Sequence, residues 1–396
     1  MFRHEPLGTQ LEAVSADPVR TLIVGAGVAG ASLAALQRRR GRHPVLIDRA
    51  EANAPDGYML GLLPLAGNLL HTLDRYEHYL DASAAVGAYE VGDGKSRLVR
   101  HFKFGDFFEA NGAYRGIERG ALLDVVSGGG AVSWKTTVTA IRQSQDVATI
   151  TFADGTGRHH AADFDVVVVA DGLHSTTRGL VQPSGDLSTW DTGWGGWVVW
   201  ASLGDQRQDT YTEYWAAGSF VGFYPVPDRV GIFVGGPASK TAAGPRAFAE
   251  ELRARGPLGP RIETALGALT ADPHPFFWHF ADCRGSRFAY GRSVLLGDSG
   301  AGFLPTAGVG AAMAMDSAAA LDDELSRTGR EHVPFALELY ERRQRPRVLA
   351  AHRDSRRLAR IMFTESRTVS WLTRKLVGMV SLRAALGGIR KVIERR

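Results

Sequence analysis

One stretch of this chain, residues 21–48, runs from a short apolar strand through a glycine-rich turn and a helix into a second strand. The first strand, Leu22–Val24, is continuously apolar, as in strands buried on both faces of a parallel sheet. The sequence GAGVAG follows at residues 25–30, and the second strand ends at Asp48. This order predicts the opening βαβ unit of an α/β fold with a Rossmann-like parallel sheet.

Each glycine of this turn has a mechanical reason. Gly25 permits the tight strand-to-helix turn, Gly27 lets a pyrophosphate approach the backbone, and Gly30 lets the helix pack on the strand. The first helical residues, Val28 and Ala29, offer free N–H groups at the positive end of the helix, where phosphates bind well. The turn therefore predicts a dinucleotide site.

The acid at the end of the second strand supports this prediction. Asp48 follows Gly30 at close to the spacing of about 20 residues at which a carboxylate holds ribose hydroxyls. A carboxylate there disfavours a phosphorylated ribose, so we expect FAD or NAD rather than NADP in this groove. Arg49 follows directly and is a further candidate cofactor residue.

Two later apolar strands also end at an acid beside a glycine. Residues 164–170 (FDVVVVA) lead into Asp171, and residues 293–296 lead into Gly297 and Asp298. In open parallel sheets, ligands bind at the carboxyl ends of the strands. Both acids are therefore expected to converge on the same cofactor.

The region between these strands, Trp190–Tyr290, is rich in aromatic and β-branched runs separated by glycine and proline, which predicts a second, mostly antiparallel sheet. It contains six of the eight tryptophans of the chain. Such a sheet could wall a pocket for a flat, apolar ligand. Because side chains alternate along a strand, about half of any list of wall residues should face away; our candidates are Trp200, Tyr214, Phe223 and Tyr224.

Helices are expected in three places. Tyr114–Val126 reads as one helix with Arg119 near its beginning, placed to reach back to the cofactor. A second helix follows Gly308, and the chain from Val333 onward is expected to be helical with breaks at Pro346 and at the glycine pair 387–388.

Composition limits the class of protein. A chain of 396 residues with 44% hydrophobic residues is expected to form about two domains. The single cysteine, Cys283, excludes a disulfide framework and fits a reducing compartment. The first twenty residues lack a secretory h-region, and no apolar segment is long enough to span a membrane. We therefore expect a soluble, cytoplasmic protein with no integral membrane association.

Charge and short motifs exclude several other functions. The net charge of +4 comes from a basic region after Arg342 that lacks interleaved aromatic residues, so a solvated helix face is favoured over a nucleic-acid site. The histidines lack metal-ligand spacing, so no metal is expected. The GDSG sequence at residues 297–300 misses the nucleophile-elbow pattern of serine hydrolases.

Three separated motifs resemble those of the class A flavoprotein monooxygenases, the group of p-hydroxybenzoate hydroxylase and the tetracycline-inactivating monooxygenases. The first is GAGVAG with its distal IDR. The second is ADGLHSTTR, with Asp171, Gly172, Ser175 and Arg178 in place. The third is GDSGAGFLPTAGVG, and Arg119 with Leu122 matches a minor RxxL motif. This chain departs from the family pattern at Ala301, where the family usually has histidine, and at Ala312, where it often has asparagine.

The resemblance implies roles for the motif residues. Asp298 would bind the ribityl chain, and Asp171 would support the segment around the pyrophosphate and the nicotinamide donor. Arg119 would meet the cofactor from the far side. A loop would lie against the isoalloxazine ring, with the positive end of the following helix toward the flavin; its residues are Pro305, Gly308, Val309, Gly310 and Ala311.

The resemblance also implies a division into domains. The expected FAD-binding domain is discontinuous, residues 1–72, 110–178 and 285–333. The expected substrate domain comprises residues 73–109 and 179–284, and residues 334–396 form a C-terminal helical segment.

We therefore expect a monooxygenase with non-covalent FAD, NAD(P)H as a transient co-substrate, and O2. It would insert one oxygen atom into an aromatic or polyketide-like molecule of secondary metabolism. Because the cofactor carries the chemistry, no acid–base residue is assigned. Alternatives are a flavin-dependent reductase, an FAD-holding cyclase acting on an apolar substrate, or a non-catalytic binding protein. Oligomeric state stays open.

Overall fold

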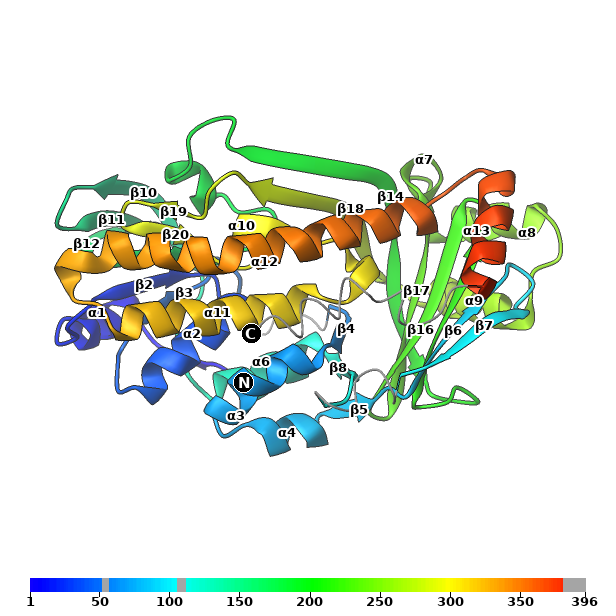
Figure 1. Ribbon diagram of the computed structural model, residues 1–396, viewed down its shortest axis with the longest axis horizontal. Helices are drawn as coiled ribbons and strands as arrows, with labels where there is room; N and C mark the ends of the chain where they lie inside the picture. The colour runs from blue at the N-terminus through cyan, green and yellow to red at the C-terminus, as the bar shows by residue number, and fades with distance from the viewer. Residues whose placement is uncertain (52–56, 105–111, 380–396) are drawn as a thin grey trace.

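The computed structural model describes residues 1–51, 57–104 and 112–379. A parallel sheet with its covering helices lies on one side of the molecule, and a large sheet with two short covering helices lies on the other (Figure 1). The long helix α12 (Val333–Met362) runs alongside both parts (Figure 1).

The five-stranded sheet has the order β19-β20-β13-β2-β3. Its last four strands pair in parallel, as the apolar runs predict, and only β19 is antiparallel to its neighbour. The strand bounds are β2 (Thr21–Val24), β3 (Val45–Ile47), β13 (Val166–Val169), β19 (Ala289–Tyr290) and β20 (Ser293–Leu295).

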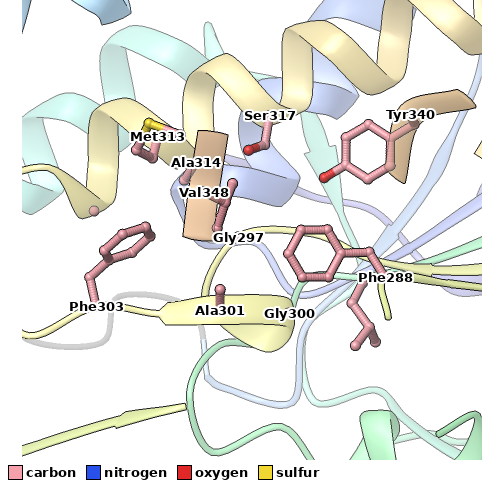
Figure 2. A pocket seen from close by; sticks show the side chains of 12 residues that line it. Phe288, Gly297, Gly300, Ala301, Phe303, Met313, Ala314, Ser317, Tyr340 and Val348 are labelled. Atoms are coloured by element: carbon pink, nitrogen blue, oxygen red, sulfur yellow. The ribbon is translucent and has the colours of Figure 1, made fainter. Parts of the chain in front are cut away.

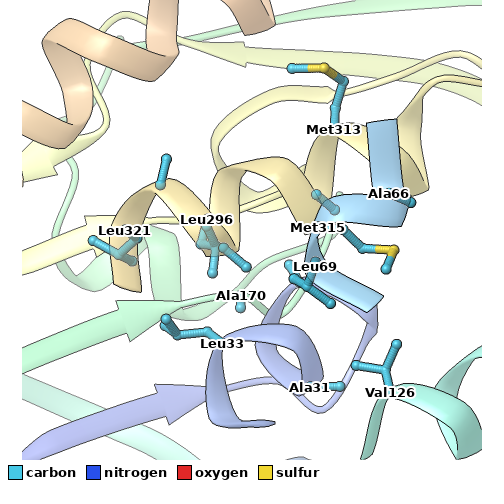
Figure 3. Close-up of a cluster of buried hydrophobic side chains, with 14 of the residues drawn as sticks. Ala31, Leu33, Ala66, Leu69, Val126, Ala170, Leu296, Met313, Met315 and Leu321 are labelled. Atoms are coloured by element: carbon cyan, nitrogen blue, oxygen red, sulfur yellow. The ribbon is translucent and has the colours of Figure 1, made fainter. Parts of the chain in front are cut away.

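Strand alternation divides the core of this sheet in two. Ile23 and Leu46 face α2 (Val28–Arg39) and α11 (Gly310–Ser326), where Figure 3 shows Leu33, Leu296, Met315 and Leu321 packed together. Leu22 and Val45 face a three-stranded sheet on the other side. That sheet contains β10 (Thr137–Gln143), β11 (Ala148–Ala153) and β12 (His159–Phe164).

The aromatic region forms most of a seven-stranded sheet with the order β18-β14-β17-β16-β15-β6-β7. All pairs are antiparallel except β15 with β6, so the expectation of a mostly antiparallel sheet is confirmed. The bounds are β6 (Ala88–Gly92), β7 (Leu98–Lys103), β14 (Leu187–Ser202), β15 (Thr210–Ala216), β16 (Ser219–Val226), β17 (Arg229–Pro237) and β18 (Phe276–Gly285).

Helices α8 (Pro245–Ala254) and α9 (Pro260–Ala271) cover one face of the seven-stranded sheet. These two helices were not predicted from the sequence. Each begins with proline at its first position, which suits a helix N-terminus. Phe248 and Leu266 are fully buried between these helices and the sheet, so the helices make this face a closed core.

A small sheet, β4 (Met59–Leu62), β8 (Arg115–Glu118) and β5 (Ser83–Ala85), lies between the two parts. Its presence corrects the prediction of one helix over Tyr114–Val126. The first part of that segment is β8, and α6 (Arg119–Ser127) begins only at Arg119. A Cβ at Gly116 would overlap the carbonyl oxygen of Pro225 on β16. The glycine therefore allows β8 to pack closely against β16.

Helix α12 continues through Pro346, which corrects the predicted break at that residue. Tyr340, Val348 and Ala351 are buried on both sides of the proline, so packing holds the helix across the missing hydrogen bond. Phe363 follows α12, and α13 (Arg367–Met379) comes next. The predicted break at residues 387–388 lies outside the described residues.

The remaining elements are short. They are β1 (Arg3–His4), α1 (Leu7–Val14), η1 (Pro64–Ala66), α3 (Gly67–Thr72), α4 (Tyr76–Asp81), β9 (Ala131–Val132), η2 (Thr177–Leu180), α7 (Ala238–Thr241), α10 (Asp298–Ala301), η3 (Pro305–Ala307) and η4 (Arg330–His332). Among the described residues, no helix is long and apolar enough to cross a membrane. The predicted division into domains stays a prediction, and residues 52–56, 105–111 and 380–396 of it lie outside the described residues.

Candidate active site

The glycine turn after β2 is shaped by contacts with the neighbouring strand. Gly25 has a φ of +109°, and a Cβ there would overlap the carbonyl oxygen of Ala170 at the end of β13. A Cβ at Gly30 would overlap the carbonyl oxygen of Gly25. Around Gly27, in contrast, no atom lies within 4 Å of the position that a Cβ would take. The turn is tight on the protein side and open on the other.

The acid that follows β3 holds this turn. The N–H of Ala26 donates to Asp48 Oδ2 at 2.7 Å, and the N–H of Ala50 donates to Oδ1 at 2.8 Å. Asp48 therefore lies beside the glycine turn, as its spacing predicts. Helix α2 has no side-chain cap at its N-terminus, so its first N–H groups are available to a ligand.

A cleft of about 170 Å³ opens in front of the turn. It brings together residues from β2, β3, α6, β10 and the end of β13, which lie far apart in the sequence. The predicted cofactor residues that line it are Gly25, Gly27, Asp48, Arg49, Arg119 and Asp171; the others that line it include Thr136, Gly172 and Thr177. Val28, Ala29 and Gly30 continue from the same turn into α2.

Asp171 presents an acceptor to this cleft. Its Oδ2 accepts a hydrogen bond from the N–H of Thr177 at 3.2 Å. Its Oδ1 is buried and has no hydrogen-bond partner among the described residues. The next residue, Gly172, has a φ of +86° and no atom within 4 Å of its would-be Cβ. An unpaired acceptor beside an open glycine fits a polar ligand that supplies donors.

The arginine of the second motif, Arg178, contacts backbone carbonyl oxygens of two separate segments. Arg178 is 8% exposed, and its Nη1 donates to the carbonyl oxygen of Ser299 at 2.8 Å. Its Nη2 donates to the carbonyl oxygen of Leu173 at 3.2 Å. Arg178 therefore ties the second motif to the third and holds their backbones together.

Asp298 lies at the start of α10 and shares a neighbour, Tyr58, with Arg119 of the cleft. Solvent reaches its side chain, yet protein surrounds it closely enough that desolvation raises its pKa to about 6. Tyr58 interacts with both Asp298 and Arg119, and its ring lies 4.5 Å from that of Trp278. Tyr58 was not among the predicted site residues, because it belongs to none of the motifs.

The loop predicted to face the flavin lies between the two parts of the molecule. It begins with η3, turns at Gly308 with a φ of +58°, and enters α11 at Gly310. A Cβ at Gly308 would lie 2.7 Å from the hydroxyl of Tyr114. Within the loop, the side chain of Val309 is buried, and Ala311 is half-buried at the start of α11.

Helix α12 supports this loop from behind. The hydroxyl of Ser355 donates to the carbonyl oxygen of Leu304 at 3.1 Å, and the hydroxyl of Thr306 donates to the carbonyl oxygen of Ser355 at 3.0 Å. These bonds fix the position of the residues around Pro305.

Ala301, one of the two departures from the family motif, lies beside a small internal void (Figure 2). The void has a volume of about 10 Å³, close to the space that one water molecule needs. Phe288, Phe303 and Tyr340 line its other sides (Figure 2). The other departure, Ala312, is fully buried in α11.

The four candidate wall residues divide between the two faces of the seven-stranded sheet. Tyr214 and Phe223 pack into the cluster under α8 and α9. This face is closed, so we correct the prediction and withdraw these two as pocket walls. Tyr224 lies on the opposite face and touches both the core of the parallel-sheet part and the aromatic cluster near Leu304.

Trp200, the fourth candidate, belongs to β14. The guanidinium of Arg229 lies 4.0 Å from its ring centroid, and Arg229 forms an ion pair with Glu118 at the end of β8. The indole Nε1 is buried and has no hydrogen-bond partner among the described residues. Trp200 therefore lies at the edge of the sheet toward the small sheet.

The face of the sheet that carries Tyr224 is covered in part by the end of α12 and by Phe363. It also has a buried carboxylate that was not predicted. Glu213 accepts hydrogen bonds from Trp215 Nε1 and the Tyr224 hydroxyl, each at 2.9 Å, and from the Tyr89 hydroxyl. Burial raises the pKa of Glu213, and the three hydrogen bonds oppose that shift. No sequence motif marks this cluster, because its members come from three strands.

Comparison with known proteins gives a consistent result. The family described as FAD binding domain matches residues 122–355. A 3-amino-4-hydroxybenzoate 2-monooxygenase from Streptomyces cremeus is 28% identical over 352 residues, which are 86% of this chain and 87% of that protein. A flavin-dependent monooxygenase from an unknown prokaryotic organism is also 28% identical, but the match spans only 41% of this chain and 42% of that protein.

Among solved structures, Klebsiella pneumoniae HpxO complexed with FAD and uric acid superposes with a TM-score of 0.81 at 20% sequence identity. The match covers 95% of this chain and 96% of that one. The overall fold is therefore shared across nearly the whole length.

Proposed function

The chain belongs to the FAD binding domain family and is an FAD-dependent monooxygenase, and we propose that it uses NAD(P)H and O2 to hydroxylate a small aromatic molecule of secondary metabolism. One observation carries the proposal: Asp48, Arg119 and Asp171 come from three separate motifs and line one cleft. The unpaired Oδ1 of Asp171 and the open space at Gly27 and Gly172 fit a dinucleotide in that cleft.

Each cofactor residue then has a proposed role. The N–H groups of Gly27, Val28 and Ala29 bind the pyrophosphate at the positive end of α2. Asp48 accepts from the ribose and keeps the turn in place through Ala26. We further assign Arg49, Arg119 and Asp171 to the polar wall of the cleft.

The flavin end is proposed to lie between Asp298 and the loop Pro305–Ala311. When bound, FAD would supply the redox chemistry, namely reduction by the nicotinamide and reaction with O2. The chain's part is to orient the ring with the backbone of Gly308, Val309 and Gly310, and to hold that loop through Ser355. Asp298 accepts from the ribityl chain, and the positive end of α11 favours negative charge near the ring.

The substrate is proposed to lie between this loop and the face of the seven-stranded sheet that carries Tyr224, with Tyr224 and Trp200 among its contacts. The aromatic clustering on that face favours a flat ring. The relative from Streptomyces cremeus is named for a hydroxylated, amino-substituted benzoate, which supports an aromatic substrate here. We also propose that the protein works in the cytoplasm.

The first experiment is the visible spectrum of the purified protein, followed by anaerobic addition of NADPH or NADH with a panel of aromatic ligands. We expect flavin bands that bleach faster with a true substrate, and one O2 consumed for each product formed. Bound flavin that neither nucleotide reduces would contradict the proposal and favour an FAD-holding cyclase. Nucleotide oxidation without O2 uptake would favour a reductase.

A further inference from the structure

A buried carboxylate lies on the face of the seven-stranded sheet that carries Tyr224. Glu213 belongs to β15 and is 7% exposed. Its neighbour Tyr214 points into the closed core under α9, so Glu213 points to the opposite, cofactor-side face. The roles proposed above for cofactor and loop residues do not use this group.

Both oxygens of Glu213 are occupied by donors. Oε2 accepts from Trp215 Nε1 at 2.9 Å and from the hydroxyl of Tyr89. Oε1 accepts from the hydroxyl of Tyr224 at 2.9 Å. The carboxylate is buried, and these three hydrogen bonds replace those that water would make.

The bonds determine what the two tyrosines can offer to a ligand. A phenol has one hydrogen, so a tyrosine that donates it to Glu213 has only oxygen lone pairs left. Tyr89 and Tyr224 are partly exposed, whereas Glu213 lies behind them. At these two positions, a ligand would therefore meet hydrogen-bond acceptors and not donors.

A series of contacts connects these tyrosines to the loop that is proposed to face the flavin. The ring of Tyr224 is 5.1 Å from that of Tyr211, which is 5.7 Å from that of Tyr114. The hydroxyl of Tyr114 lies against Gly308. A ring bound between the loop and the sheet would therefore approach this cluster.

A cation, Arg100, lies on the same face as Glu213. Across the strands, Glu213 pairs with Val91 and Val91 pairs with Arg100, whose guanidinium lies 5.4 Å from the ring of Phe102. Two strand spacings, roughly 10 Å, separate Arg100 from Glu213 along this row. Glu90, one residue from Val91, points to the other face and pairs with His101.

We propose that Glu213 determines substrate preference by fixing Tyr89 and Tyr224 as hydrogen-bond acceptors. The site then favours a planar ring that carries a hydroxyl or amino donor. It disfavours the same ring when the substituent can only accept, because two facing acceptors leave both unpaired. This inference rests on the proposed function only for the location of the substrate.

The test measures ligand binding to the FAD-loaded protein without NAD(P)H, from the change in flavin absorbance. The probes are 2-naphthol, 2-methoxynaphthalene and 2-naphthoate, which share a ring and differ in donor and charge. We expect the wild type to bind 2-naphthol about ten-fold more tightly than 2-methoxynaphthalene. The acceptor-only naphthoate should bind more weakly than 2-naphthol as well.

Two substitutions isolate the carboxylate. Glu213→Gln supplies an amide N–H, so one tyrosine can turn its hydroxyl to the ligand, and the preference should fall to within about three-fold. Glu90→Gln is the matched control, because it makes the same change on the adjacent strand toward the other face, and it should keep the wild-type preference. Tyr224→Phe removes one acceptor together with one of the three donors to Glu213, and should also lower the preference for 2-naphthol.

The outcomes separate this inference from the proposed function. A wild-type protein that binds the three probes equally or not at all, or a Glu213→Gln protein that keeps the preference, would overturn it. If Glu213→Gln does not retain FAD, Tyr224→Phe decides the matter with the same criterion. Failure of the enzyme to hydroxylate any ligand would contradict the proposed function and leave the measured preference in place.

Discussion

The two large sheets of this protein differ in the structural feature that defines the role of their residues. At the parallel sheet, backbone shape at the strand ends defines the site, because a side chain at Gly25 or Gly30 would collide with a carbonyl oxygen. At the seven-stranded sheet, the face on which a side chain lies defines its role. Glu213 and Tyr214 are adjacent, yet Glu213 lies on the face that carries Tyr224 and Tyr214 lies in the closed core under α8 and α9.

The difference has a practical consequence. A cofactor site built from backbone turns leaves a fixed glycine pattern in the sequence, so it can be recognised there. A substrate site built from side chains on alternate positions of several strands leaves no contiguous pattern. The following predictions test this contrast between the two sheets.

The largest effect is expected for Gly30→Ala. The new Cβ would overlap the carbonyl oxygen of Gly25 inside the turn, so we expect loss of FAD and destabilisation of about 4 kcal/mol or more. Flavin absorbance per protein and a urea unfolding curve measure both. Gly8→Ala is the control, because no atom lies within 4 Å of its would-be Cβ; an intact FAD content in Gly30→Ala would contradict the backbone argument.

The closed face should matter for stability and not for ligands. Phe223 is 2% exposed in the cluster under α9, so Phe223→Ala should cost about 3–5 kcal/mol of unfolding free energy. Chemical denaturation measures this cost, and the ligand affinity of the folded fraction should stay unchanged. Tyr224→Phe on the opposite face should show the reverse, with a smaller stability change and altered binding. If both substitutions changed ligand affinity equally, the proposed difference between the two faces of the sheet would be wrong.

A smaller effect is expected at the support of the flavin-facing loop. Ser355→Ala removes the hydroxyl that donates to Leu304 and should destabilise by about 1 kcal/mol. If that bond positions the loop, the flavin absorbance maximum and the rate of flavin reduction should also change. Ser326→Ala serves as the comparison, because its hydroxyl bonds only within the end of α11. Identical flavin spectra in both variants would mean that Ser355 stabilises α12 alone.

The smallest effect concerns pH. The pKa of Asp298 is raised to about 6 in the folded, flavin-free protein, so the folded state binds its proton more tightly than the unfolded chain. The flavin-free protein should therefore gain stability as pH falls from about 6 toward 4, and Asp298→Asn should lack this part of the pH dependence. Melting temperatures of both proteins across this range measure it; parallel curves would contradict the raised pKa.

Much of the cofactor side could be predicted from the sequence. The apolar strands, the turn at Gly25, the acid Asp48 and the approach of Asp171 to the same cleft all follow from local patterns and from the rule that parallel strands end at one edge. The role of Arg178 was less predictable, because its contacts with Leu173 and Ser299 depend on how two distant loops meet.

The α/β class and the FAD family could be read from the amino-acid order alone, because glycine turns and buried strands depend on short stretches of chain. Three other features needed the folded chain: on which face of the seven-stranded sheet each aromatic side chain lies, that β8 is a strand, and that α12 continues through Pro346. The donors that surround Glu213 come from β6, β15 and β16. Their meeting depends on the register of paired strands, which contacts distant in the sequence establish.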